Sequence, residues 1–329
     1  MKLVYVFYYI GGGKIIKHFE SKGLDVRSFR LPTVNRKYRF ATKKEVVIKE
    51  AKALIKLLLS LPTLRNAKVY CVSGQYACML IFKLLGPLMG KEARLYLHNF
   101  YLHGLSKNNT VRKVLRFLMS SKRITLIAQT PNEESFFRGL STKIGIRFVP
   151  YCGDMLLEYT ERNIIDEGYI FTGGYTNRDY QIMSRLAYMM PNQRFVFVCS
   201  NLNEDFIVPS NVKVYKDIPT DQFQNLLMKS AIVVIPLKED VGSSGQMLCL
   251  QAMRCAKPIV YCNVSAISYY FKNGCGYPYK IGDIESLSSA VNDALSNKIE
   301  NIGKNARQES MNYTKDKELK MVDEVIGIL

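Results

Sequence analysis

The chain has 329 residues, enough for two domains that each bury a hydrophobic core. Hydrophobic residues make up 48% of it, and no run of eighteen apolar residues occurs, so the composition excludes a disordered protein and predicts no membrane-spanning helix. The net charge of +18 is uneven: residues 1–165 hold 29 Lys and Arg against 10 Asp and Glu, and residues 166–329 hold 17 against 18. A first half of +19 predicts an anionic partner, with nucleic acid and the cytoplasmic membrane leaflet as the candidates.

Apolar strand-like runs alternate with helical patterns through the first half. The first run, Leu3–Tyr8, has one basic residue before it and no small-residue cleavage site after it, which predicts a buried strand and not a signal peptide. Further strands are predicted at Asp25–Phe29, Lys68–Val72, Arg94–His98, Ile124–Ala128 and Ile146–Val149, and helices at Lys14–Ser21, Lys44–Ser60, Gln75–Leu85, Asn109–Ser120 and Asn132–Leu140. This alternation predicts a parallel sheet with helices on both faces.

The same pattern starts again after the polar stretch Leu157–Gly168. Strands are predicted at Tyr169–Thr172, Arg194–Cys199, Val212–Tyr215, Ile232–Pro236 and Pro258–Tyr261, and helices at Arg178–Met189, Thr220–Leu227, Gly245–Arg254 and Ile284–Ser296. The chain is therefore predicted to be α/β, with two doubly wound domains at residues 1–160 and 161–305. Residues 306–329 are predicted as a C-terminal helix that packs back on the first domain.

Eight cysteines are spread along the chain without any CxxC pair, and only three histidines occur. A metal site is therefore not expected, and the cysteines are interpreted as reduced, buried thiols of a cytoplasmic protein.

Each half opens with a strand that runs into glycines, at Gly11–Gly13 in the first half and at Gly173–Gly174 in the second. Ligands of open α/β sheets bind at the carboxyl ends of strands, where glycine lets the backbone approach a phosphate. Neither loop reads GxGxxG, and no acidic residue closes a strand about twenty residues later, which disfavours a nicotinamide dinucleotide. Taken alone, either cluster also fits a tight turn between a strand and a helix.

A glycine and serine loop, Gly242–Gln246, leads directly into an apolar helical pattern that ends at Lys257-Pro258. Unpaired N–H groups and the helix dipole favour an anion at such a helix start. A serine-capped helix after a surface loop is the alternative interpretation.

Together these motifs resemble the C-terminal domain of glycosyltransferase family 4, also called group 1. The resemblance rests on the order and spacing of FTGG from Phe171, RDY from Arg178, SGQ from Ser244, LQAM from Leu250, AKPIV from Ala256, GCG from Gly274 and GD at Gly282. It covers about residues 169–296, while the first half matches in architecture alone. It implies the GT-B fold, in which two Rossmann-like domains face a cleft and the second holds a nucleotide-activated sugar.

Carried onto this sequence, the resemblance implies a donor site without a metal or other cofactor. The diphosphate of a UDP- or GDP-sugar would be held by Gly242, Ser243, Ser244, Gly245 and Gln246, by Gly173 and Gly174, and by Gly12 and Gly13 of the first half. Arg178 would be the catalytic cation, because a diphosphate leaving group gains charge in the transition state. Its alternative interpretation is a solvated residue in the first turn of a helix.

The sequence departs from the family at two positions where many relatives carry glutamates eight residues apart. Here they are Ser243 and Gln251. An amide at Gln251 still accepts a hydrogen bond from a ribose hydroxyl. A branch of the family with a Gly-Gln loop is similar, so the enzyme is expected to be active. Glu239 and Asp240, just upstream, are either substitutes for the missing acids or part of a charged surface loop.

His98 ends a predicted strand, where family members often place a histidine that reaches the donor sugar. His98 is the second predicted catalytic residue, and His103 is the next candidate for this role. The alternative is that His98 is a structural histidine. His18 is expected to have no role in the site.

Two helical stretches of the first half, around Lys43–Lys56 and Thr110–Arg123, combine an apolar stripe with many lysines and arginines. They are either ordinary outer helices or elements that dock on anionic lipid.

The resemblance therefore implies a retaining glycosyltransferase that moves a sugar to a hydroxyl of a glycan or lipid-linked glycan, in surface polysaccharide or glycolipid assembly. It is expected in the cytoplasm, peripherally on the inner face of the membrane, without nucleic acid as a partner. The alternatives are another GT-B enzyme such as an epimerase, a basic protein that binds nucleic acid or membrane, and a catalytically silent partner subunit.

Overall fold

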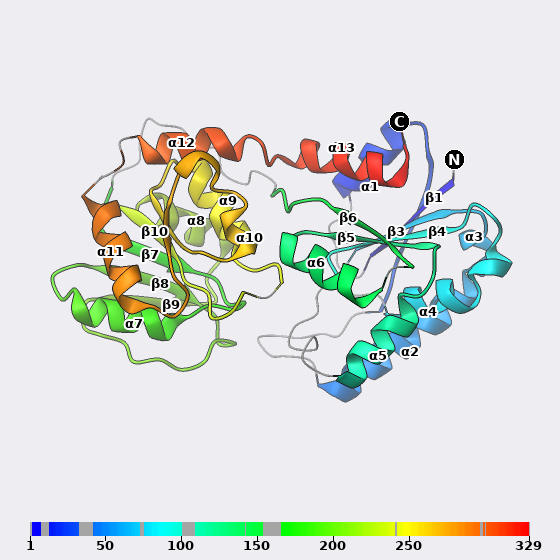
Figure 1. The fold of residues 1–329 in the computed structure, drawn as a ribbon, viewed down its shortest axis with the longest axis horizontal. Helices are drawn as coiled ribbons and strands as arrows, with labels where there is room; N and C mark the ends of the chain where they lie inside the picture. The colour runs from blue at the N-terminus through cyan, green and yellow to red at the C-terminus, as the bar shows by residue number, and fades with distance from the viewer. Residues whose placement is uncertain are drawn as a thin grey trace. The chain divides into compact units, whose positions relative to one another are not determined.

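A computed structural model describes residues 2–7, 13–32, 42–72, 76–100, 109–141, 143–153, 166–240, 242–296, 299 and 301–328. The chain divides into two compact units: unit 1 comprises Met1–Pro150 with Glu318–Leu329, and unit 2 comprises Tyr151–Lys317. Each unit is built on a six-stranded sheet, and every paired strand is parallel to its neighbour (Figure 1). The predicted α/β class with two doubly wound sheets is confirmed.

The sheet of unit 1 has the strand order β2-β1-β3-β4-β5-β6. Its strands are β1 (Lys2–Phe7), β2 (Asp25–Arg30), β3 (Lys68–Val72), β4 (Arg94–His98), β5 (Ile124–Ala128) and β6 (Gly145–Phe148). The connecting elements are α1 (Gly13–Ser21), α2 (Lys43–Leu59), α3 (Leu61–Leu64), α4 (Tyr76–Leu84), the 3-10 turn η1 (Gly86–Met89), α5 (Asn109–Leu118) and α6 (Pro131–Leu140). All the predicted strands and helices of this half form, with ends that differ by at most two residues.

Unit 1 has two hydrophobic cores, because successive side chains of a strand point to opposite faces of the sheet. One core joins Val4, Val69 and Leu95 of the strands to side chains of α2, α4, α5 and α6. The other joins their sequence neighbours Leu3 and Tyr70 to α1 and to the last helix of the chain, α13 (Lys315–Ile326). The sheet is thus covered on both faces, as the continuous apolar strands predict.

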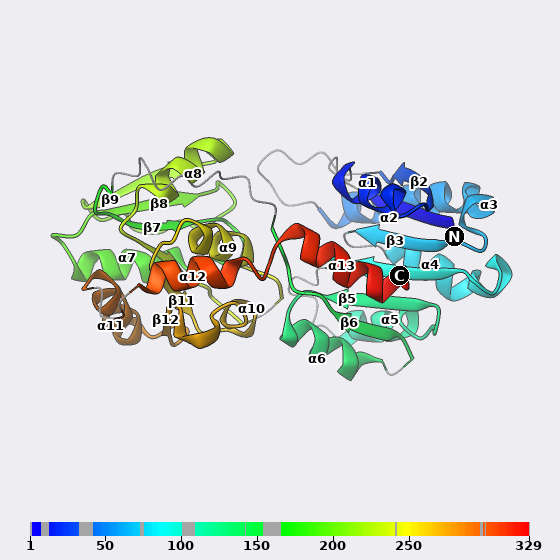
Figure 2. The same ribbon diagram turned by 90° about the horizontal axis from the view of Figure 1, so that it is seen from above.

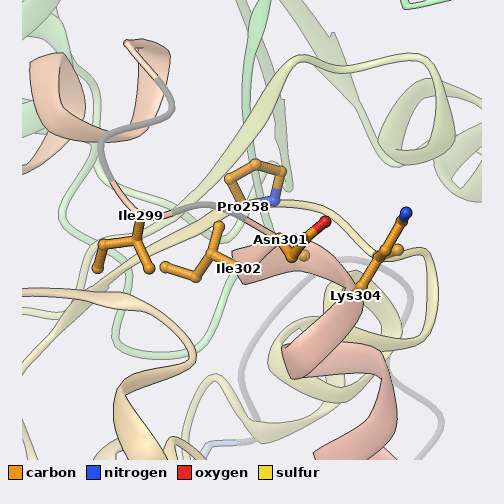
Figure 3. A pocket seen from close by; sticks show the side chains of 7 residues that line it. Pro258, Ile299, Asn301, Ile302 and Lys304 are labelled. Carbon is orange, nitrogen blue, oxygen red and sulfur yellow. The ribbon is translucent and has the colours of Figure 1, made fainter.

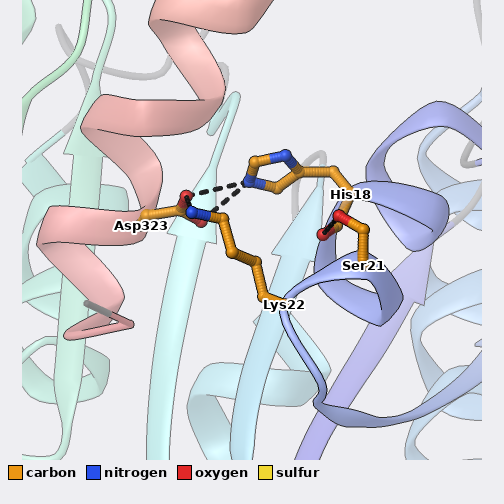
Figure 4. Close-up of polar contacts among 4 residues, drawn as sticks. All are labelled: His18, Ser21, Lys22 and Asp323. Atoms are coloured by element: carbon orange, nitrogen blue, oxygen red, sulfur yellow. Dashed lines mark hydrogen bonds and ion pairs between the residues drawn. The ribbon is translucent and has the colours of Figure 1, made fainter.

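The last helix is fastened to unit 1 by polar contacts as well as by its apolar side chains. Asp323 of α13 accepts a hydrogen bond from Nε2 of His18 on α1 at 2.9 Å, and Nζ of Lys22 lies 3.7 Å from the same carboxylate (Figure 4). Leu319, Val322 and Ile326 lie in the core beside α1. His18 therefore has a structural partner, and it joins the beginning of the chain to its end.

The segment predicted as one C-terminal helix, 306–329, is divided between two helices. The first, α12 (Ile302–Ser310), belongs to unit 2 and contacts α9 (Gln246–Arg254). The break follows from Tyr313, whose ring packs at 4.7 Å from the ring of Tyr270 and whose carbonyl accepts a hydrogen bond from Arg254. These contacts hold residue 313 within unit 2 before α13 begins.

The sheet of unit 2 has the strand order β12-β11-β10-β7-β8-β9. Its strands are β7 (Ile170–Gly173), β8 (Phe195–Cys199), β9 (Val212–Lys216), β10 (Ile232–Ile235), β11 (Ile259–Cys262) and β12 (Tyr277–Tyr279). Besides α9 and α12, the other elements are α7 (Tyr180–Met189), α8 (Thr220–Met228), α10 (Ser265–Ser268), the 3-10 turn η3 (Lys272–Gly274) and α11 (Ile284–Leu295). The elements α10 and β12 were not predicted, because they are too short to show a period and β12 contains a proline.

All eight cysteines are buried and none is in a disulfide, as expected from their spacing. Burial raises the pKa of Cys255, Cys262 and Cys275 to about 11, so these thiols stay protonated at neutral pH.

Candidate functional site

The strand order of unit 2 marks one position at which a ligand is favoured. From β7 the chain moves outward through β8 to β9, and then returns to the other side of β7 to form β10. Ligands of doubly wound sheets bind outside the carboxyl ends of the strands at such a reversal. Two predicted loops follow these two strands: Gly173–Gly174 after β7, and Gly242–Gly245 between β10 and α9.

The turn after β7 is tied by hydrogen bonds to the segment after β10. The N–H of Asp179 donates to the carbonyl of Pro236 at 3.1 Å, and the N–H of Lys238 donates to the carbonyl of Asn177 at 3.2 Å. The side chain of Asn177 also donates to the carbonyl of Glu239 at 2.7 Å. Asn177 has a φ of 55°, a conformation that asparagine tolerates better than most residues. The two turns are thus held side by side at the end of the sheet.

Arg178 lies in this junction and is only 7% exposed. Its Nε donates to the carbonyl of Gly173 at 2.8 Å, and its Nη1 donates to the carbonyl of Thr176 at 2.9 Å. Burial lowers the pKa of the guanidinium, but arginine keeps its proton in proteins. Within the described residues, no acidic side chain forms an ion pair with it. In the part of the chain that the structure describes, this buried positive charge is therefore hydrogen-bonded by backbone carbonyls alone.

Arg178 is not in the first turn of the following helix, contrary to its alternative interpretation. The helix α7 begins at Tyr180, and its N-cap is Asp179, whose carboxylate accepts a hydrogen bond from the N–H of Ile182 at 2.9 Å. Arg178 instead forms a β-bridge with Leu237, just beyond the end of β10.

The glycine turn is shaped around the guanidinium. Gly174 has a φ of +107°, and a Cβ at this position would lie 2.9 Å from Nη2 of Arg178. The hydroxyl of Tyr180 donates to the carbonyl of Gly174 at 2.6 Å. Tyr180 is a site residue that was not predicted, although it belongs to the RDY motif of the resemblance.

The second loop leads into the N-terminus of α9. The N-cap residue of this helix makes no side-chain hydrogen bond to the backbone N–H groups of the first turn. The N-cap of α9 is Gly245, with a φ of +83°, and a Cβ there would lie 2.9 Å from Ile267 and 3.1 Å from Ile235. Only glycine fits this position, because the backbone passes so close to the end of β10. In contrast to α7, which Asp179 caps, α9 presents a helix N-terminus whose cap residue offers no carboxylate to compete with an anion.

The serine and glutamine side chains around this loop differ in their surroundings. Ser244 is buried, and Ser243 and Gly242 are half-buried. The amide of Gln246 donates to the hydroxyl of Tyr270 at 3.2 Å, and that hydroxyl donates to the carbonyl of Tyr151. The side chain of Gln246 is therefore engaged within unit 2. Gln251 lies half-buried in the second turn of α9.

The strand ends beside the junction carry a further polar group. The N–H of Asn201, after β8, donates to the carboxylate of Asp217, after β9, at 3.0 Å.

His98, the predicted catalytic residue of unit 1, ends β4 and is only 2% exposed. Its Nδ1 lies 2.5 Å from the hydroxyl of Tyr70, and its Nε2 lies 3.4 Å from the amide nitrogen of Gln129. These contacts fix the plane of the ring. Gly13 is the first residue of α1, whereas Gly11, Gly12 and His103 lie outside the described residues.

No group of three or more His, Cys, Asp or Glu side chains in the described part of the chain is arranged to hold a metal ion. A hollow of about 340 Å³ does occur in unit 2, beside the start of α12 (Figure 3). It is lined by Ala256, Pro258, Ile299, Asn301, Ile302, Gly303 and Lys304. Since Pro258 directly precedes β11, this hollow lies at the amino end of that strand, opposite to the edge with the glycine turns.

Comparison with known proteins identifies the second half of the chain. Residues 195–309, from β8 to α12, match the family model described as "Glycosyl transferases group 1". Over this part of its length the chain is similar to the group 1 glycosyltransferases. No curated protein matches the sequence of the chain significantly.

Solved structures extend the likeness to the whole length of the chain. Sucrose-phosphate synthase from Thermosynechococcus elongatus superposes with a TM-score of 0.71 and 13% identity, over 99% of this chain and 98% of that one. HepE of Anabaena in complex with UDP-glucose gives 0.71 and 13% over the full length of both chains. A UDP-forming α,α-trehalose-phosphate synthase from Burkholderia xenovorans gives 0.68 and 12%, over 100% and 98%. At these identities the likeness shows the GT-B fold.

Proposed function

We propose that this protein is an enzyme that transfers a sugar from a nucleoside-diphosphate sugar to a hydroxyl group of a glycan or lipid-linked glycan. The observation that carries the proposal is the junction at the end of the unit 2 sheet. There the buried guanidinium of Arg178, the glycine turn at Gly174 and the start of α9, whose N-cap is Gly245, all follow two adjacent strands. One structural neighbour, HepE of Anabaena, has been solved in complex with UDP-glucose and with UDP.

The proposed reaction breaks the bond between C1 of the sugar and the diphosphate oxygen, and forms a bond between C1 and the acceptor oxygen. The acceptor hydroxyl loses its proton, and the nucleoside diphosphate leaves with the electron pair of the broken bond. Negative charge grows on the leaving oxygens in the transition state, where a fixed cation and fixed N–H groups stabilise it most. In this proposal Arg178 and the backbone of Gly242–Gln246 supply that stabilisation, with Gly173 and Gly174 allowing the diphosphate to approach.

The finer assignments are proposals that rest on the family resemblance. They comprise retention of the anomeric configuration, a UDP- or GDP-sugar without a metal, contact of Gln251 with the ribose, and a contribution of Gly12, Gly13 and His98. The same holds for a role in surface polysaccharide or glycolipid assembly and for a cytoplasmic location at the inner membrane face. Analysis of the product anomer tests retention, and an inverted product would exclude it.

A thermal-shift screen with UDP-, GDP- and ADP-sugars tests the donor site. We expect one class of donor to stabilise the protein by roughly 2.7 kcal/mol at about a hundred times its dissociation constant. Absence of any shift across the three nucleotides would contradict the proposal.

A matched pair of variants at Met247 tests the position of the diphosphate. Met247 is 60% exposed and is the second residue of α9. Met247→Glu adds a carboxylate that the helix dipole tolerates but that repels a bound diphosphate, whereas Met247→Gln has nearly the same shape without the charge. We expect the donor-induced shift to shrink in Met247→Glu alone. Equal shifts in both variants would place the diphosphate elsewhere.

The substitutions at Ser243 and Gln251 favour a second candidate, a catalytically silent subunit that binds the donor. Its signature is a normal thermal shift without turnover on any acceptor. Detectable hydrolysis or transfer of the donor sugar by the purified chain would exclude it.

A further inference from the structure

The helix α2 is apolar on both of its sides, although only one side faces the core of unit 1. Ala53 and Leu57 are buried against the sheet. On the opposite side, five large apolar side chains face solvent: Val47 at 67%, Ile48 at 43%, Ile55 at 58%, Leu58 at 42% and Leu59 at 80% exposure. Scattered exposed leucines are ordinary, but five large apolar side chains exposed on one side of a helix, towards both of its ends, indicate a surface with a partner.

Neighbouring elements continue this exposed apolar character. α4 contacts both α2 and α5, and all three pack on the same core of unit 1, as the two ribbon views agree (Figures 1 and 2). Leu84 at the end of α4 and Leu88 in η1 are 56% and 78% exposed, and Val114 and Phe117 of α5 are both 51% exposed. We refer to these residues and the five of α2 as the outer face.

The outer face also carries positive charge. Lys44 and Lys52 on α2, and Lys113 and Arg116 on α5, are exposed, and none of the four forms an ion pair within the described residues. α4, η1 and α5 contain no acidic residue. The two acids of α2 are engaged locally: Glu45 accepts from the N–H of Thr42 at 2.8 Å in the helix cap, and Glu50 accepts from the N–H of Ala77 at 3.1 Å. The exposed charge of these helices is therefore almost entirely positive.

We propose that the outer face docks unit 1 on an anionic lipid bilayer. Large apolar side chains interleaved with lysines and arginines fit the boundary between lipid headgroups and acyl chains, where the first enter the apolar layer and the second contact phosphate. The charge of +19 carried by unit 1 attracts the whole unit to such a surface. None of the described helices is both long and apolar enough to cross a membrane, so this contact is peripheral.

The absence of tryptophan from the sequence allows a direct test of this contact. Leu59→Trp places a single fluorophore on the outer face, and Ile207→Trp places one at a position of similar exposure, 77%, in unit 2. With vesicles of phosphatidylglycerol and phosphatidylcholine we expect a blue shift for Leu59→Trp and none for Ile207→Trp. Phosphatidylcholine vesicles alone, or high salt, should abolish the shift. No shift of Leu59→Trp with anionic vesicles would overturn the proposal.

A charge-matched pair of double variants separates this face from the general charge of the protein. Lys52→Gln with Lys113→Gln removes two charges from the outer face, and Lys17→Gln with Lys320→Gln removes two exposed charges from α1 and α13, which cover the other face of the sheet. Since each near-surface cation contributes about 1 kcal/mol, we expect the first pair to weaken vesicle binding about 25-fold. The second pair should change it less than about threefold, because screening leaves only long-range attraction. Equal losses would overturn the assignment of the face.

A second copy of the chain is the competing occupant of the outer face. Sedimentation of the protein without vesicles tests for such self-association. A blue shift of Leu59→Trp that grows with protein concentration in the absence of vesicles would assign the face to a second copy of the chain and overturn the proposal. Leu59→Ser and Ile55→Ser should keep the melting temperature of the parent while reducing vesicle binding on the order of tenfold. Vesicle binding needs no sugar donor, so its failure and a failure of the proposed transfer reaction are separate results.

Discussion

The two units share one architecture but differ in where their unusual features lie. Both have a six-stranded parallel sheet with helices on its two faces. Unit 1 carries 29 Lys and Arg against 10 Asp and Glu, a charge of +19, and its unusual features are the exposed apolar and basic sides of α2 and α5. Unit 2 carries 17 against 18, a charge of −1, and its unusual features are a buried arginine and glycine turns at the ends of β7 and β10.

The comparison shows which parts of a doubly wound domain remain open to function. A parallel sheet is buried on both faces, so its strands serve the core. Only the loops at the strand ends and the outer sides of the helices are left for ligands and partners. Unit 2 has its distinctive residues in the loops at the strand ends, and unit 1 has them on the outer sides of the helices.

The largest effect is expected from Arg178→Met, which replaces the buried guanidinium by an apolar side chain of similar length. Loss of a fixed cation at the leaving group should lower kcat/KM about 10²- to 10³-fold. Removal of a buried unpaired charge need not lower the stability of the fold. Steady-state kinetics with the donor found in the thermal-shift screen provide the measurement.

Arg185→Met is the matched control for that variant. Arg185 lies on the exposed side of α7, one helical turn and a half from the site, and its loss should leave kcat/KM unchanged within about twofold. Equal activity of the two variants would show that Arg178 serves the fold of unit 2 and not the leaving group.

The next effect concerns the glycine turn at Gly174, a feature of unit 2. Gly174→Ala should lower the free energy of unfolding by about 3 kcal/mol, because the added Cβ meets Arg178 at 2.9 Å and the backbone has a positive φ. Gly282→Ala also has a positive φ, +71°, but open space around the Cβ, so it should lose only about 1 kcal/mol. Urea unfolding of both variants measures the difference. Equal losses would mean that the guanidinium does not constrain the turn.

The smallest effect concerns the attachment of α13, which completes unit 1 with a segment from the end of the chain. His18→Ala, Asp323→Ala and the double variant form a thermodynamic cycle, and we expect a coupling free energy of about 1–2 kcal/mol. Lys22→Ala should lower the free energy of unfolding by less than about 0.5 kcal/mol, since the side chain of Lys22 is half-exposed. A coupling near zero would mean that the apolar residues of α13 alone hold it in place.

Much of the fold follows from patterns that are local in the sequence. Short apolar runs such as Lys68–Val72 and Ile124–Ala128 predict buried parallel strands, and their ends agree with β3 and β5. The missed elements α3, α10 and β12 have four, four and three residues, which is too short for a periodic signal. The break between α12 and α13 was missed because it depends on packing of Tyr313 against residues more than forty positions away.

The sequence by itself determined the α/β class, the repeated arrangement of the two sheets, the uneven charge and the glycine loops, because each depends on composition or on short-range spacing. Only the tertiary structure decided that Arg178 is buried among carbonyls, since its partners come from a turn whose shape depends on β10. Likewise, only the packing of α2 and α5 decided which of their apolar residues enter the core. An amphipathic pattern predicts that a helix has two different sides, but packing against a sheet determines which side remains in solvent.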